Sequence, residues 1–157
     1  MSELPSEKLP RLHATQLTGW TNMKVLVNID VPALAPAVAF YTAALGLKLN
    51  RVIEEDVAEL AGASSVIYLL QNPPGSQAAS TLARARDYAR HWTPVHLDFV
   101  VDDVAVAAKR AIGAGAAQES ECIQWNGSKC ITFSDPFGHG FCLIEFAAET
   151  YSGGNGM

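Results

Sequence analysis

Alternating apolar and polar positions make residues 94–103 (PVHLDFVVDD) the clearest predicted strand of the chain. Successive side chains of a strand point to opposite faces. Three of its residues, His96, Asp98 and Val100, fall on one face, and an apolar row falls on the other. A histidine and an aspartate on one face of a half-buried strand indicate a polar site beside a core. A structural histidine, satisfied by hydrogen bonds, is the plainer alternative.

The upstream half of the chain predicts a strand, a helix and three further strands. Residues 24–31 alternate, and residues 34–45 carry apolar side chains at helical spacing up to Gly46, a typical helix stop. Short strands are predicted over 47–53, 56–60 and 65–70. Residues 72–90 open with two prolines and a glycine and turn polar, which predicts a loop with one or two helical turns.

The downstream half repeats this plan. The strand at 94–101 runs into Asp102 and Asp103, which can cap a helix over 104–114. A strand over 118–125, a hairpin turn at Asn126-Gly127 and strands over 129–133 and 141–146 follow. Leu26 aligns with His96, and the register holds into both helices. The pattern predicts an α+β fold of two βαβββ modules, whose sheets together close a cup for a small ligand.

Composition and charge restrict the possible partners. The 157 residues are 49% hydrophobic and 17% charged, which fits one globular domain. A net charge of −5 without a basic stripe argues against nucleic acid. No apolar run approaches the roughly 18 residues that span a bilayer, and no signal-peptide pattern is seen, so a cytoplasmic protein without membrane contact is expected. Cys122, Cys130 and Cys142 lack metal-ligand spacing and are expected to be free thiols.

Three runs carry a family resemblance: residues 31–41 (VPALAPAVAFY) with Leu45-Gly46-Leu47, residues 96–103 (HLDFVVDD) and residues 135–145 (DPFGHGFCLIE). Together they resemble the vicinal oxygen chelate superfamily, which includes glyoxalase I, bleomycin-resistance proteins, fosfomycin-resistance thiol transferases and extradiol dioxygenases. The resemblance implies a domain over 23–148 with modules at 24–71 and 93–147 and a connector at 72–92. An N-terminal arm (1–22) and a flexible tail (149–157) flank it. The motifs are specific to the superfamily and not to one activity.

The resemblance also implies a metal site. Its four inward positions correspond to Leu26, Tyr68, His96 and Glu145. His96 and Glu145, expected on one concave face, suit Zn, Ni, Mn or Fe. Leu26 cannot bind a metal, and Tyr68 would have to lose a proton about three pH units below its pKa. His91 is the candidate third donor, so a divalent metal is expected to be weakly bound or absent.

Two function classes follow from this reasoning, and both involve a small molecule in the cup. In the first, a metal polarises the oxygens of a substrate and Glu145 moves a proton, as in lyase, isomerase, thiol-transfer or dioxygenase chemistry. In the second, the protein binds a compound without metal, as bleomycin-resistance proteins do. A vestigial assembly module is a third possibility, and a homodimer is expected in each case. The candidate ligand contacts are Asn28, Asp30, Tyr68, Asp98 and Trp92.

Overall fold

The computed structural model describes residues 24–81 and 84–147, so the predicted arm and tail lie outside the described residues. Within them the chain forms two βαβββ modules, as predicted. The first contains β1 (Val27–Val31), α1 (Leu34–Leu45), β2 (Lys48–Ile53), β3 (Val57–Ala61) and β4 (Ile67–Gln71). The second contains β5 (Leu97–Val100), α2 (Val104–Gly113), β6 (Ala117–Gln118), β7 (Ile123–Trp125), β8 (Ser128–Ser134) and β9 (Gly140–Glu145).

Each module builds one mixed sheet with the same topology. The first sheet has the order β1-β4-β3-β2, and the second has β5-β9-β8-β6 with β7 also paired to β8. The first and last strands of each module are parallel neighbours. The predicted strand over 118–125 is split into β6 and β7, because residues 119–122 lie opposite only residues 131–132 of β8 and bulge out of the ladder. In this bulge the Ser120 hydroxyl accepts the Thr132 N–H at 2.9 Å in place of a main-chain acceptor.

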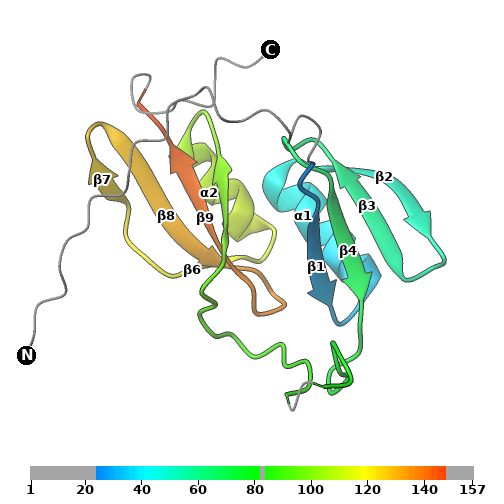
Figure 1. Cartoon of the computed structure of the whole chain (residues 1–157). Coiled ribbons are helices and arrows are strands. Elements are labelled where there is room, and N and C mark those ends of the chain that lie inside the picture. Colours follow the sequence, from blue (N-terminus) through cyan, green and yellow to red (C-terminus); the bar gives the residue numbers. More distant parts are fainter. Residues whose placement is uncertain (1–23, 82–83, 148–157) are drawn as a thin grey trace, which may run out of the picture.

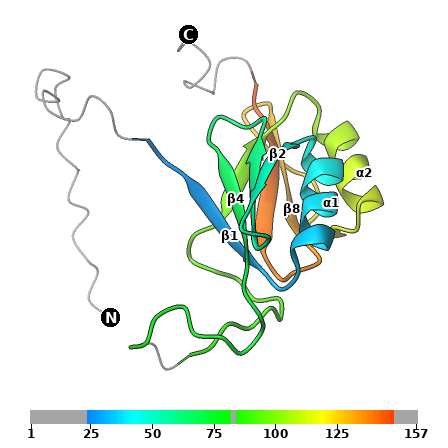
Figure 2. The same cartoon turned by 90° about the vertical axis from the view of Figure 1, so that its right-hand side faces the viewer.

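The helices cover one face of both sheets (Figures 1 and 2). Figure 2 shows α1 and α2 together in one layer beside the strands. Alternate strand residues point toward the helices and form the apolar core, which explains the period of two in the sequence. We call the sheet face turned away from the helices the open face. Core residues that are almost completely buried include Val31, Leu60, Leu69, Phe133 and Leu143.

The two modules meet along a seam where β1 and β5 face each other without joining into one sheet among the described strands. Helix α1 packs on α2, and the Arg110 Nε–H donates to the Ala44 carbonyl at 3.0 Å. The buried Tyr41 hydroxyl on α1 donates to Asp135 Oδ2 at 2.7 Å. Side chains and helix packing therefore hold the modules together.

Figure 1 shows the connector below the two modules, and its described part forms no helix, so the predicted helical turns are wrong there. Arg86 ties the connector to β1 by pairing with Asp30 at 2.7 Å, and the Tyr88 hydroxyl donates to the Asn72 carbonyl within the connector at 2.7 Å. The connector folds back on itself, since Gln77 and Ala85 form an antiparallel bridge. Among the described residues, neither helix, α1 or α2, is long and apolar enough to cross a membrane.

Candidate functional site

A cleft of about 650 Å³ lies along the seam between β1 and β5. Its wall is mainly apolar, and none of the described residues that line it is a lysine or an arginine. The polar lining comes from few side chains, including Asn28, Asp30 and His96. An apolar hollow with a few polar groups is the usual form of a small-molecule site. The apolar and aromatic lining residues include Leu26, Val95, Leu97, Phe99 and Phe141.

The acid in this cleft, Asp30, is already paired. Its Oδ2 accepts from Arg86 Nε at 2.7 Å and its Oδ1 from Asn72 Nδ2 at 2.8 Å. The Asp30 carbonyl accepts from His139 Nε2 at 2.6 Å, so this histidine ties the last turn of module 2 to β1. The carboxylate therefore brings little free negative charge to the cleft, and Arg86 is not available to a ligand.

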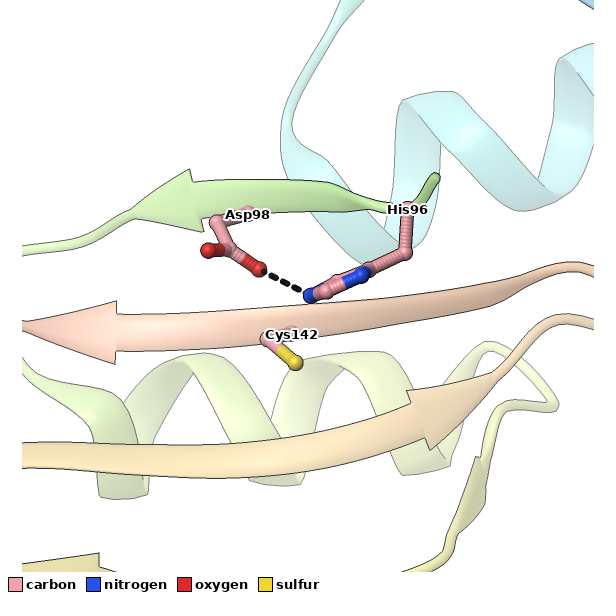
Figure 3. Close-up of side chains that lie close together, drawn as sticks. All are labelled: His96, Asp98 and Cys142. Carbon is pink, nitrogen blue, oxygen red and sulfur yellow. Dashed lines mark ion pairs between the residues drawn. The ribbon is translucent and has the colours of Figure 1, made fainter. Parts of the chain in front are cut away.

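His96 lines the cleft and also belongs to a second group of side chains, on the open face (Figure 3). His96 Nε2 lies 3.2 Å from Asp98 Oδ1, and one donor atom each from His96, Asp98 and Cys142 lies within 4.8 Å of the others. The parallel register places Asp98 of β5 opposite Cys142 of β9. The predicted alternation around His96 is confirmed, because Leu97 and Phe99 pack against the core on the other face.

The thiols of this face are protonated at neutral pH. Burial raises the pKa of Cys142 above its ordinary value. Burial, together with the neighbouring Cys142, raises the pKa of Cys130 to about 12. A protonated thiol is a weak nucleophile, so the arrangement does not by itself favour covalent thiol catalysis. Cys122 is exposed, and all three cysteines are free, as the sequence predicts.

Glu145 lies on the other face of β9, so the prediction that it shares a concave face with His96 is wrong. It shares its face of the strand with the buried core residues Phe141 and Leu143. Its Oε1 accepts from Lys129 Nζ at 2.7 Å, and its Oε2 accepts from the Val104 N–H at 3.0 Å. The Lys129 ammonium and then the Val104 N–H lower the pKa of Glu145. The carboxylate thus stabilises the N-terminus of α2.

Two further predicted residues are hydrogen-bonded to partners other than His96. The Tyr68 hydroxyl donates to Glu59 Oε2 at 2.8 Å, in a network that holds the pKa of Glu59 at about 2, chiefly through Arg51. His91 donates from Nδ1 to the Ala89 carbonyl at 2.9 Å and lines a different hollow, in the connector.

The residues at the four positions implied by the family resemblance therefore do not fit one metal ion. Leu26 has no donor atom, the Tyr68 hydroxyl is bound to Glu59, and Glu145 is on the opposite face. Trp92, predicted as a roof, packs on the His96 ring with 4.8 Å between centroids and is not among the residues lining the cleft. Sequence reasoning missed Cys142, whose position depends on the pairing of β5 with β9.

The comparisons with known proteins agree with this architecture. The model of a family described as a glyoxalase-like domain matches residues 26–144. A search of curated proteins found no match. Lactoylglutathione lyase from Agrobacterium tumefaciens is similar with a TM-score of 0.57 and 17% identity, over 83% of this chain and 98% of that one. The fosfomycin resistance protein FosX from Listeria monocytogenes has a TM-score of 0.61 and 18% identity, over 82% and 96%. Hypothetical protein SA1046 from S. aureus has a TM-score of 0.60 and 21% identity, over 82% of this chain and 100% of that one.

Proposed function

The chain belongs to the glyoxalase-like domain family, and from this premise we propose that it binds a small molecule in the cleft between β1 and β5. The ligand has an apolar body and is neutral or positively charged. The observation that carries this proposal is the cleft lining, which is mainly apolar and, among the residues that the structure describes, contains neither lysine nor arginine.

The charge expected of this ligand differs from the charge of the ligands named for two similar structures. A glutathione conjugate and fosfomycin are both anions, and an anion that leaves water needs a cationic partner. Within the described part of the chain the cleft offers none, since Arg86 is bound to Asp30, and the chain as a whole carries −5. Apolar contacts with Phe99 and Phe141 and polar contacts with Asn28 and His96 support a neutral or cationic aromatic ligand instead.

A second candidate is metal-assisted lyase or isomerase chemistry on the bound molecule. The group of His96, Asp98 and Cys142 favours it, because His96 also lines the cleft. A divalent ion such as Zn, Ni, Mn or Fe, if held there, would polarise oxygens of the ligand. Glu145 has no part in this candidate, since its two oxygens face Lys129 and the start of α2.

A homodimer is part of the proposal. Large apolar side chains are exposed at the cleft, among them the lining residues Val25, Leu26 and Val95, and Trp92 is exposed as well. Covering such a patch with a second copy would remove apolar surface from water, and closed two-fold dimers are the commonest oligomers.

Two fluorescent aromatic probes of opposite charge test the ligand class: the cation proflavine and the anion 8-anilinonaphthalene-1-sulfonate. We expect the cation to bind more tightly. The variant Asn28→Lys, which adds a positive charge inside the cleft, should weaken proflavine binding by about tenfold, or about 1.4 kcal/mol. The matched control Gln124→Lys adds the same charge on exposed β7 and should change binding by less than about twofold. Tighter binding of the anion, or equal effects of the two lysines, would contradict the proposal.

A further inference from the structure

Three different donor atoms converge on the open face of the second sheet. The distance of 3.2 Å between His96 Nε2 and Asp98 Oδ1 is close to the edge of about 3.4 Å expected for tetrahedral ligands about 2.1 Å from an ion. The Cys142 sulfur completes a group in which the donor atoms lie within 4.8 Å of one another. Small side-chain rotations would bring all three to one ion.

The direction of approach distinguishes this group from a catalytic Cys-His-Asp triad. In such a triad the acid and the nucleophile contact different nitrogens of the histidine. Figure 3 shows the Asp98 carboxylate and the Cys142 sulfur on the side of the ring that carries Nε2. One proton on Nε2 can serve only one of them, whereas one cation can bind all three atoms.

From this geometry we propose that His96, Asp98 and Cys142 form a site for a thiophilic divalent cation of the Zn²⁺ type. The nitrogen, oxygen and sulfur donors match the ligands of Zn²⁺ and Co²⁺. Mg²⁺ requires octahedral oxygen ligands and is excluded by the imidazole and the sulfur. Three protein ligands leave a fourth position for water or a ligand atom. The donor set differs from the imidazole and carboxylate pair that the resemblance implied.

The strands hold this site in place before a cation arrives. Asp98 and Cys142 are register partners in the parallel pair of β5 and β9, and His96 directly precedes β5. Trp92 packs on the His96 ring and restricts its rotation. Binding of the cation does not depend on the ligand proposed for the cleft, and only His96 is common to both sites.

Cobalt spectroscopy on the reduced, tag-free full chain tests the proposal, because a thiolate bound to Co²⁺ produces a near-ultraviolet charge-transfer band. We expect one Co²⁺ per chain with this band, displaced by Zn²⁺ and not by Mg²⁺. Cys142→Ser should abolish the band, and His96→Ala should weaken binding by at least tenfold. The double variant Cys122→Ser/Cys130→Ser retains Cys142 as its one thiol and should keep the band.

A measurement on the wild-type chain covers the case in which Cys142→Ser does not fold. Zn²⁺ should slow alkylation of Cys142, measured by mass spectrometry, and leave the exposed Cys122 unaffected. Persistence of the charge-transfer band in Cys142→Ser, its loss in the double variant, or displacement of Co²⁺ by Mg²⁺ would overturn the proposal. Equal alkylation of Cys142 with and without Zn²⁺ would do the same.

Discussion

Replacing Tyr41 by phenylalanine should measure how strongly one hydrogen bond joins the two modules. The Tyr41 hydroxyl donates to Asp135 Oδ2 at 2.7 Å in the buried seam. A hydrogen bond to a charged group contributes about 1.5–3 kcal/mol. In this variant Asp135 Oδ1 still accepts the N–H groups of Phe137 and His139, so the carboxylate is not left unpaired. We therefore expect Tyr41→Phe to lower the free energy of unfolding by about 2 kcal/mol, or Tm by about 4–8 °C.

The pH dependence of this loss gives a second readout. Burial, and after it the negative charge of Asp135, raises the pKa of Tyr41 well above 10.0. The folded state therefore keeps the phenol proton at a pH where the unfolded state loses it. The contribution of Tyr41 is complete below pH 10 and falls above it by up to about 1.36 kcal/mol per pH unit. The difference between wild type and Tyr41→Phe should shrink between pH 9 and pH 11.

Urea unfolding followed by circular dichroism provides the measurement, with Asp135→Asn and the double variant completing a cycle. Because the two side chains are in contact, we expect the effects to be non-additive by more than about 1 kcal/mol. Tyr68→Phe, which removes a hydroxyl bonded to Glu59 at the sheet surface, is the control and should cost less. An additive cycle, or a Tyr41→Phe variant as stable as wild type, would refute the reasoning.

Four other outcomes are expected. Gly138→Ala should lower the free energy of unfolding in urea by at least about 2 kcal/mol, because φ is +91° and a Cβ would collide with the Tyr88 carbonyl. The control Gly113→Ala, with open space around it, should not be destabilised. The pKa of Glu59 is about 2 in the folded state against a usual 4.5, so its carboxylate stabilises the fold above pH 4.5 and loses this effect as the pH falls toward 2. Glu59→Gln should therefore make unfolding at acid pH, followed by circular dichroism, less steep. Glu145→Gln should lower Tm and leave the Co²⁺ spectrum unchanged; an altered spectrum would place Glu145 at the metal. Light scattering at micromolar concentration should give twice the chain mass of 16.8 kDa, and a monomer would contradict the dimer.

Local patterns in the sequence predict most of the fold, because several turns and helix ends have residues suited to their backbone conformation. Gly46 ends α1 with φ of +69°, and Asn126 and Gly127 both adopt the positive φ of a tight hairpin turn. Asp103 caps α2 by accepting the Val106 N–H at 2.9 Å, as predicted. The split between β6 and β7 could not be predicted, since it depends on the register of both strands on β8, which leaves residues 119–122 opposite only residues 131–132.

The site was harder to predict, for two different reasons. The face of Glu145 was readable, because Phe141 and Leu143 lie on the same side of the strand and are typical core residues. The contact between Asp98 and Cys142 could not be predicted from the sequence. Alternation shows which residues of one strand share a face, but it does not show which residues of a neighbouring strand lie beside them. Only the parallel register of β5 and β9 brings these two residues together.

The seam between the modules also determines how this cleft can change. Its walls belong to two sheets, and their separation depends on how closely α1 approaches α2. Both helices bury small side chains, Ala37 and Ala44 on α1 and Ala107 and Ala111 on α2. Larger residues where α1 contacts α2 would move one sheet relative to the other as a rigid body and widen the cleft without breaking a strand ladder. The range of accepted ligand sizes can therefore evolve through substitutions that never touch the ligand.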